Sequence, residues 1–414
     1  MEQGRPLFNC RLQEGGMLPK IVFCIADGMG DYPVPSLGGK TPLEAAETPE
    51  LDALCPNGLQ GQAQTIPEGM GPGSDVANMA LLGYPPRTYH TGRGPIEAAA
   101  QGLTLASNDI VWRLNLVTTD GWTPEAVLRD YAAGHIDTAT ARDMILELNE
   151  TFGDSTWQLV PGIQYRHLLV QKGGADSPEA ELAIRPPHDI LDQPIGADLE
   201  AFGSSPALKT LLASSAERLA SRGGTATALW PWGQGKSLHL PDFSERFGLK
   251  GQVVSAVDLV KGLGRAAQMD VAEVPGATGL LDTNYAGKVE AALEFLDQGD
   301  FVYLHVEAPD ECGHAGDPEA KQEAIARFDS RVLAPLRQAL GQTAYFMVAC
   351  DHLTPVRERT HTSDPVPFLL SGPGLRPNTA HSTFTEATAD SAELSLSAGE
   401  DLLPFVLKTI ADLK

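Results

Sequence analysis

The feature that most constrains this chain is a set of short apolar runs that do not alternate with polar residues. A strand with one face in water alternates, whereas a strand covered on both faces does not. Helical spacing separates several of the runs. The sequence therefore predicts an α/β fold with a mostly parallel sheet sandwiched by helices. The predicted strands are KIVFCIA (20–26), QVVSAV (252–257), FVYLHVEA (301–308), TAYFMVAC (343–350) and VPFLLSG (366–372).

Two helical patterns lie beside these strands. One follows the i, i+3, i+4, i+7 spacing over 289–296, and the other runs over 325–332. Pro335 follows the second pattern, and proline cannot donate the backbone hydrogen bond that a helix interior needs. Pro335 is therefore predicted to kink or restart that helix.

Residues 109–189 follow a different pattern. The run 111–117 alternates, with Arg113 and Asn115 on its polar face, and the candidate strand 163–170 displays Arg166 in the same way. A helical segment, 139–148, lies between them. The pattern predicts a small α+β domain at 109–189, inserted into a core domain formed by 1–108 and 190–414.

The charge of the chain restricts its partners. The 414 residues include 54 acidic and 30 basic side chains, for a formal net charge of −24. Such a surface repels nucleic acid and anionic membranes, so neither is an expected partner. A small phosphorylated substrate remains compatible, because bound metal ions reverse the local field. The sequence makes no prediction of oligomeric state.

The cysteines indicate a reducing compartment. Five are scattered along the chain, an odd number without the spacing of a disulfide framework. No basic segment precedes a long apolar core at the N-terminus, and the apolar stretch 21–26 is too short to span a bilayer. We expect a cytoplasmic protein. The five are Cys10, Cys24, Cys55, Cys312 and Cys350.

Acidic residues and histidines gather at the ends of the predicted strands. In an open α/β sheet, ligands bind at the carboxyl ends of the strands. A single aspartate in such a place is often a helix cap or a turn former, but this set is larger. Mixed Asp and His ligands suit Zn²⁺, Mn²⁺ or similar ions. The candidates are Asp27, Asp310, His314, Asp351 and His352 after strands, and His361 before one.

Ser74 opens an apolar, helix-like run after glycines at 69, 71 and 73. It has two interpretations that are compatible with each other. As an N-cap it would bond the first amides of the helix. As a nucleophile it would sit where the helix N-terminus favours a phosphate, and coordination to a metal would activate its hydroxyl.

Three further motifs are less specific. Arg93, between two glycines ahead of a helix, is as compatible with a phosphate contact as with a surface turn. LWPWGQGK (229–236) matches neither a Walker A loop nor a dinucleotide fingerprint, and its Trp230 and Trp232 favour the core. DYAAGHI (130–136) offers Asp130 and His135.

Together these segments resemble the archaeal-type, cofactor-independent (2,3-bisphosphoglycerate-independent) phosphoglycerate mutases of the alkaline phosphatase superfamily. The resemblance covers most of the chain. It rests above all on ADGMGD (26–31), PEGMGPGSDVANMALLGYPP (67–86), HVEAPDECGHAGD (305–317) and DHLTPVRERTHTSDPVPF (351–368). It implies an alkaline-phosphatase-like core with the 109–189 insertion as a substrate-binding lid.

The resemblance also implies a cofactor and its ligands. Two divalent ions are expected, most often Mn²⁺ or Zn²⁺ and in some relatives Mg²⁺ or Co²⁺, without 2,3-bisphosphoglycerate. One ion would be held by Asp310, His314 and His361. The other would be held by Asp27, Asp351, His352 and the hydroxyl of Ser74.

The implied reaction interconverts 3-phosphoglycerate and 2-phosphoglycerate through a phosphoserine at Ser74. Arg93 and Lys288 would contact the phosphate. The lid would exclude water while glycerate reorients, since water would turn a mutase into a phosphatase. Its candidates for binding the substrate are Arg113, Asn115, Asp130, His135 and Arg166.

One segment departs from the family pattern, and three alternatives remain open. Before WGQG the family carries a longer basic segment, of which only Arg218 and Arg222 remain here, and Pro231 replaces an apolar residue. A homoserine kinase-like phosphotransferase would share Ser74 and the metals. A metal-dependent phosphatase or phosphonate hydrolase needs only the core. A silent scaffold predicts a broken ligand set, whereas all seven presumed ligands are present.

Overall fold

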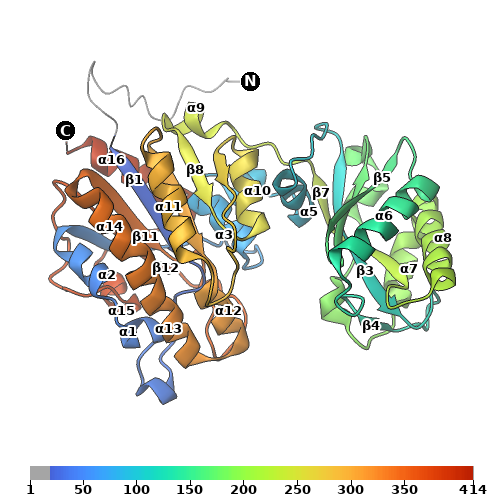
Figure 1. Cartoon of the computed structure of the whole chain (residues 1–414), viewed down its shortest axis with the longest axis horizontal. Coiled ribbons are helices and arrows are strands. Elements are labelled where there is room, and N and C mark those ends of the chain that lie inside the picture. The colour runs from blue at the N-terminus through green and yellow to red at the C-terminus, as the bar shows by residue number, and fades with distance from the viewer. Residues whose placement is uncertain (1–18, 414) are drawn as a thin grey trace. The chain divides into compact units, whose positions relative to one another are not determined.

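A computed structural model describes residues 19–413 of the chain (Figure 1). The chain divides into two compact units. Unit 1 consists of the described residues up to His90 together with those from Leu240, and unit 2 is Thr91–His239. Unit 2 is longer at both ends than the predicted segment 109–189, because a helix before that segment and a strand after it pack on the same small sheet.

Unit 1 is built around an eight-stranded sheet in the order β13-β2-β12-β11-β1-β10-β8-β9. β1 runs parallel to both of its neighbours, β10 and β11. The five predicted strands are all present, and the mostly parallel α/β class is confirmed. The strands are β1 (Lys20–Ala26), β2 (Gly58–Ala63), β8 (Gly251–Val254), β9 (Asp270–Ala272), β10 (Phe301–Val306), β11 (Ala344–Ala349), β12 (Val366–Ser371) and β13 (Ser395–Leu396).

The side chains of β1, β10 and β11 are buried along the length of each strand, apart from Lys20 at the start of β1. This explains why their sequences show no alternation. Helices enclose the sheet, and α11, for example, packs against β8 and β10. The helices of unit 1 are α1 (Pro42–Ala45), α2 (Pro49–Leu54), α3 (Ser74–Leu81), α4 (Pro86–Tyr89), α9 (Phe243–Phe247), α10 (Asp258–Ala266), α11 (Tyr285–Leu296), α12 (Ala308–Ala315), α13 (Pro318–Phe328), α14 (Ala334–Leu340), α15 (Glu386–Ser391) and α16 (Leu402–Ala411).

The antiparallel strand β12 matters for the position of His361. β12 pairs with β11 in the opposite direction, with Ala349 opposite Phe368. The start of β12 therefore lies at the same edge of the sheet as the carboxyl ends of β1 and β11. A residue just before β12 reaches the edge where residues following the parallel strands gather.

The helix predicted to restart at Pro335 does so. α13 ends at Phe328, a π-helical turn covers Asp329–Leu333, and α14 begins at Ala334 with Pro335 in its first turn. Proline is tolerated in a first turn, because its missing N–H has no partner there in any helix.

Unit 2 contains an antiparallel five-stranded sheet in which β3 pairs with β4, β6 and β7. Trp112, Leu114 and Leu116 belong to its main core, as the alternation predicts, and Trp230 and Trp232 join them. The elements are β3 (Ile110–Thr119), β4 (Leu128–Asp130), β5 (Trp157–Ile163), β6 (Arg166–Gln171), β7 (Ala228–Lys236), α5 (Arg93–Ala100), α6 (Thr138–Phe152), α7 (Gly196–Gly203) and α8 (Pro206–Arg222).

The four cysteines in the described part of the chain, Cys24, Cys55, Cys312 and Cys350, are free and buried. Cys10 lies outside the described residues. Between residues 19 and 413, no helix combines the length and the apolar character needed to cross a membrane.

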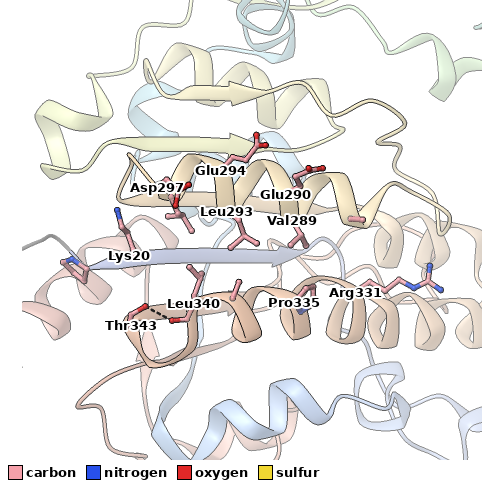
Figure 2. Close-up of a pocket in the computed structure, with 14 residues that line it drawn as sticks. Lys20, Val289, Glu290, Leu293, Glu294, Asp297, Arg331, Pro335, Leu340 and Thr343 are labelled. Atoms are coloured by element: carbon pink, nitrogen blue, oxygen red, sulfur yellow. Dashed lines mark hydrogen bonds between the residues drawn. The ribbon is translucent and has the colours of Figure 1, made fainter.

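A groove of about 1060 Å³ lies between α11 and α14 in unit 1 (Figure 2). Val289 and Leu293 line one side, and Pro335 and Leu340 the other. Lys20, at the start of β1, also lines the groove, whereas Asp27 follows the end of that strand. Seven strand residues span roughly 20 Å. The groove therefore lies at the end of β1 opposite the predicted site, and none of the predicted site residues lines it.

A buried ion pair holds the loop after β11. Lys321 of α13 is fully buried, and its Nζ donates to Asp31 Oδ2 (2.8 Å), Gly30 O (3.1 Å) and Thr354 O (2.8 Å). Asp31 Oδ2 also accepts from the backbone N–H of Val356. All three ammonium hydrogens thus have acceptors, and the ion pair ties α13 to the segments that follow β1 and β11.

We predict that Lys321→Met lowers the stability of unit 1 by about 3–5 kcal/mol, because it leaves the Asp31 carboxylate buried without its cation. All five tryptophans lie in unit 2 (112, 122, 157, 230 and 232). Urea unfolding followed by far-UV circular dichroism should therefore show the loss, while the tryptophan fluorescence transition keeps its midpoint.

Lys261→Met is the matched control, because the Lys261–Glu273 pair involves a largely exposed carboxylate. Such a pair contributes about 1 kcal/mol or less. An unchanged circular dichroism midpoint in Lys321→Met would contradict a stabilising role for the buried pair.

Candidate metal centre and nucleophile

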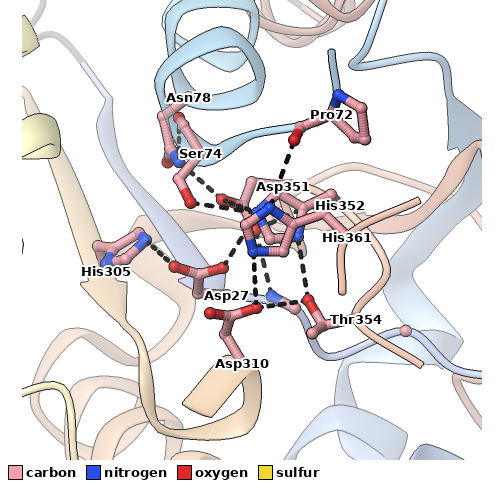
Figure 3. Close-up of polar contacts among 12 residues, drawn as sticks. Asp27, Pro72, Ser74, Asn78, His305, Asp310, Asp351, His352, Thr354 and His361 are labelled. Carbon is pink, nitrogen blue, oxygen red and sulfur yellow. Dashed lines mark hydrogen bonds and ion pairs between the residues drawn. The ribbon is translucent and has the colours of Figure 1, made fainter. Parts of the chain in front are cut away.

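The carboxyl edge of the unit 1 sheet brings six predicted ligands together. Figure 3 labels five of them, all but His314. They come from segments far apart in the sequence. Each segment either follows or precedes a strand at this edge. Asp27 follows β1, Asp310 and His314 lie on α12 after β10, Asp351 and His352 follow β11, and His361 precedes β12.

The inner group consists of Asp27, Asp351 and His352, all fully buried. Their candidate ligand atoms lie within 4.8 Å of one another. His352 Nε2 is 3.6 Å from Asp27 Oδ1 and 3.5 Å from Asp351 Oδ2. Oδ1 of Asp27 is buried and accepts no hydrogen bond from the described residues. This oxygen therefore has a lone pair available to a ligand.

The outer group consists of Asp310, His352 and His361, again within 4.8 Å of one another. His314 adjoins them, with its Nε2 2.9 Å from His361 Nε2 and 3.3 Å from Asp310 Oδ2. His352 thus belongs to both groups, and its ring stacks on that of His361. The two groups form one continuous cluster.

Burial and mutual repulsion set the protonation of the carboxylates. Burial, with Asp351 and Asp310 nearby, raises the pKa of Asp27 well above its usual range. Burial also opposes ionisation of Asp310, but hydrogen bonds from His314 and His361 outweigh it and hold that pKa well below the ordinary value. Three carboxylates that face one another in a buried place need positive charge to ionise together.

The pKa values of the imidazoles also depend on burial and on the neighbouring carboxylates. Burial lowers the pKa of His305 to about 4 and that of His352 below its usual range. The hydrogen bond to Asp310 raises the pKa of the half-buried His314 to about 9. The inner imidazoles are therefore neutral near pH 7 and available as ligands, whereas His314 carries a proton that a metal ion would displace.

Ser74 is the first residue of α3, and Gly73 occupies the N-cap position. The Oγ of Ser74 lies 3.1 Å from His352 Nε2. The N-cap interpretation is therefore wrong for this side chain. The hydroxyl instead faces the metal-ligand cluster at a helix N-terminus, where backbone amides and the helix dipole favour an anion.

Asn78, one turn further along α3, was not among the residues that the sequence pattern singled out. Its Nδ2 donates to Asp351 Oδ2 (2.7 Å) and to Ser74 O (2.9 Å), and its Oδ1 accepts from the Tyr303 hydroxyl (2.6 Å). Asn78 thereby fixes Ser74 relative to a candidate ligand. Its i+4 spacing from Ser74 is visible in the sequence, although its target is not.

His305 and Lys288 lie behind Asp27. His305 Nε2 is 3.1 Å from Asp27 Oδ2, and its Nδ1 is 3.3 Å from Ser255 Oγ. Lys288 is fully buried, and its Nζ donates to the carbonyl of His305 (2.9 Å). Burial lowers the pKa of Lys288 to about 8. These contacts do not test the phosphate contact predicted for Lys288, which stays a prediction. No signal in the sequence pointed to His305.

In unit 2, three predicted arginines gather around β3. Arg113 forms an ion pair with Glu97 (2.8 Å) and stacks on Trp232 at 4.2 Å. Burial lowers the pKa of Arg113; Glu97 opposes this shift, whereas Arg93 and Arg166 add to it. The three guanidinium groups therefore repel one another, and their roles toward a substrate stay predictions.

The other predicted substrate contacts of unit 2 have structural partners. Asn115 is buried, its Nδ2 donates to Tyr131 O, and its Oδ1 accepts from Trp232 Nε1. Asp130 accepts the backbone N–H groups of Ala132 and Gly134. It thereby shapes the turn in which His135, with φ 53°, is exposed. Their roles toward a substrate stay predictions.

Arg218 and Arg222, the remaining basic residues before WGQG, both form ion pairs with Glu147 on α6. These contacts join α8 to α6 within unit 2. They give both arginines a structural role in the segment that departs from the family pattern.

The fold and the site define a metal-dependent enzyme class. The Metalloenzyme superfamily model matches residues 19–409, so the chain belongs to that superfamily. The probable 2,3-bisphosphoglycerate-independent phosphoglycerate mutase of Geobacter sulfurreducens is 44% identical over 94% of this chain and 99% of its own length. The 2,3-bisphosphoglycerate-independent phosphoglycerate mutase of Methanosarcina barkeri is 42% identical over 94% and 99%. The chain is thus a member of the 2,3-bisphosphoglycerate-independent phosphoglycerate mutase family, as the sequence motifs indicated.

Solved structures agree with this assignment. The PH0037 protein from Pyrococcus horikoshii superposes with a TM-score of 0.79 at 29% identity, over 96% of this chain and 98% of the other. The cofactor-independent phosphoglycerate mutase from Thermoplasma acidophilum superposes with a TM-score of 0.64 at 25% identity, over 95% and 100%.

We predict a specific pH dependence for the ion-free protein. The folded pKa of His314, about 9, exceeds its ordinary value of 6.5. The His314–Asp310 pair therefore contributes stability that is fully present below pH 6.5 and is lost as the pH rises through 9. Urea midpoints of unit 1 should be measured by circular dichroism in the presence of a chelator.

His314→Gln is the comparison variant, because its amide donates a hydrogen bond without titrating. The stability advantage of the native protein over this variant should shrink between pH 6 and pH 9. An advantage that stays constant or grows over that interval would contradict the raised pKa.

Proposed function

We propose that this chain interconverts 3-phosphoglycerate and 2-phosphoglycerate through a phosphoserine at Ser74. The observation that carries the proposal is the position of Ser74 Oγ, at the start of α3 and 3.1 Å from His352 within the ligand cluster. Family relatives named for this activity, which align over nearly their full length, support the choice of substrate.

The ligand cluster fits a pair of divalent ions. Asp27 offers an oxygen without a hydrogen bond, three carboxylates converge, and imidazole nitrogens adjoin them. We propose that Asp310, His314 and His361 hold one ion, and that Asp27, Asp351, His352 and Ser74 hold the other. Mn²⁺ and Zn²⁺ suit this mixed donor set, with Mg²⁺ and Co²⁺ as further candidates. Bound ions would neutralise charge on the transferring phosphoryl group and lower the pKa of the serine hydroxyl.

Two transfers complete the reaction. In the first, Ser74 Oγ loses its proton and bonds to phosphorus while the bond from phosphorus to the C3 oxygen breaks, and that oxygen takes up a proton. In the second, the C2 hydroxyl loses its proton and bonds to phosphorus while the bond to Ser74 Oγ breaks, and Ser74 Oγ takes up a proton. Ser74 is restored, and no co-reactant is consumed.

We propose that unit 2 supplies the groups that retain glycerate between the transfers. Arg113 and Arg166 suit a carboxylate, since guanidinium groups bind it through paired hydrogen bonds. Arg93 suits the phosphate, as does Lys288 of unit 1. The other proposed contributors to substrate binding are Asn115, Asp130 and His135. Asn115 and Asp130 would act by shaping the backbone and side chains around them, through the hydrogen bonds described above. The free, buried cysteines accord with a cytoplasmic location.

The decisive experiment follows the phosphorus NMR signals of 3-phosphoglycerate mixed with the Mn²⁺-loaded protein. We expect 2-phosphoglycerate to appear without inorganic phosphate. Ser74→Ala should abolish turnover, a loss of about 10⁴-fold or more, because the nucleophile is absent. Asp75 is buried beside Ser74 and is left in place, so the helix start is preserved.

Other outcomes would overturn the proposal in distinct ways. Inorganic phosphate in place of 2-phosphoglycerate would indicate a phosphatase. Full turnover in Ser74→Ala would exclude the phosphoserine route. No reaction by a metal-loaded protein would point to another acceptor, and homoserine with a phosphate donor is the next mixture.

We further predict that Arg113→Ala lowers kcat/KM for 3-phosphoglycerate by roughly 10–150-fold, the value of one charged hydrogen bond. Metal binding should be unchanged, since the ligand cluster lies in unit 1. Arg129→Ala is the control, because Arg129 is an exposed arginine of unit 2 paired with Asp120 and Asp192. Tryptophan fluorescence checks that unit 2 remains folded, and equal kcat/KM in both variants would refute the role of Arg113.

A further inference from the structure

Thr354 touches both ligand groups. It follows His352 by two residues in the loop after β11 and is fully buried. Its Oγ1 donates a hydrogen bond to Asp310 Oδ1 of the outer group. The same Oγ1 lies 3.2 Å from Nδ1 of His352, the residue shared by both groups.

The number of hydrogens available to Thr354 and His352 determines the tautomer of the His352 imidazole. A threonine hydroxyl has one hydrogen, and here that hydrogen goes to Asp310. The contact with His352 can then be a hydrogen bond only if Nδ1 carries the hydrogen and donates it to Oγ1. Neutral His352 therefore keeps the lone pair on Nε2, the atom that faces Ser74, Asp27 and Asp351.

The surroundings hold Thr354 in this place. Its carbonyl accepts from Lys321 Nζ at 2.8 Å, so the buried ion pair of α13 fixes its backbone. A Cβ at Gly28 would lie 2.6 Å from Thr354 Oγ1 and 2.7 Å from Asp310 Oδ1, and one at Gly313 would lie 2.4 Å from Thr354 O. Both glycines thus leave space for Thr354, and Gly28 additionally has φ +62°.

We propose that Thr354 is a positioning residue that couples the two ion sites, by orienting Asp310 and by holding His352 with Nε2 directed at the inner group. This inference rests on the two-ion centre of the proposed function, but not on phosphoglycerate as the substrate. Groups that orient metal ligands in this way typically change metal affinity by 10–100-fold when they are removed.

The test compares two substitutions that each change one group on the Cβ of Thr354. Thr354→Val removes the hydroxyl and keeps the shape, whereas Thr354→Ser keeps the hydroxyl. Mn²⁺ binding to each full-length protein is measured by the electron paramagnetic resonance signal of free Mn²⁺ during titration. We expect a 10–100-fold loss of affinity in Thr354→Val, with an affinity within about threefold of the native value in Thr354→Ser.

Thr65→Val is the matched control in unit 1. Thr65 is also fully buried, but its hydroxyl makes no hydrogen bond within the described part of the chain. The Thr65→Val variant should bind Mn²⁺ with the affinity of the native protein. If Thr354→Val fails to fold, Thr354→Ala against Thr354→Ser provides the same comparison of hydroxyl absent and present.

Two results would overturn the proposal. One is native Mn²⁺ affinity in Thr354→Val, and the other is an equal loss in Thr354→Ser, which would assign the effect to packing. The metal titration also separates this inference from the proposed function. A native protein that binds Mn²⁺ but leaves 3-phosphoglycerate unchanged would refute the proposed substrate. The role of Thr354 would then still be decided by the Mn²⁺ titration.

Discussion

Repulsion between three buried carboxylates is the constraint on which the site depends. Asp27, Asp310 and Asp351 follow three adjacent parallel strands, β1, β10 and β11, and the sheet brings them to one edge. Burial and the neighbouring negative charges raise the pKa of Asp27, so the three cannot ionise together without positive charge nearby. The protonated His314 supplies part of this charge, and divalent ions suit the remainder. Folding thereby prepares a centre whose electrostatic energy falls when metal binds.

The sequence predicts the parts of this arrangement that follow from strand direction. Residues after parallel strands meet at one edge, so the order of apolar runs is enough to group Asp27, Asp310 and Asp351. This rule does not predict the position of His361, since His361 precedes its strand. It reaches the same edge only because β12 runs antiparallel to β11, a direction that no apolar run encodes. The family resemblance, carried by long motifs, supplies that assignment instead.

The residues that orient the site could not be predicted from the chain alone. Asn78, His305 and Thr354 are ordinary residues of a helix, a strand and a loop, and their partners are distant in sequence or set by side-chain direction. Unit 2 extends beyond the predicted segment 109–189 for a similar reason. α5 and β7 lie outside 109–189, yet both pack on β3, and such pairing is decided by tertiary contacts. Asn115 was assigned to a polar face, but that face is buried where Trp232 and Tyr131 bond its amide.

The two ends of the ligand cluster are held by different kinds of groups. At the inner end, Asp351 accepts from the backbone N–H of Gly28 and from Asn78, neither of which titrates. His305, beside Asp27, is kept neutral by burial. At the outer end, His314 carries its proton up to a pH of about 9. Protons therefore compete with a metal ion at both ends, at Asp27, whose pKa is raised by burial and by the neighbouring carboxylates, and at His314, whose pKa is raised by Asp310. His352 belongs to both groups, and the hydrogen that its Nδ1 donates to Thr354 leaves the lone pair on Nε2, which faces Ser74, Asp27 and Asp351.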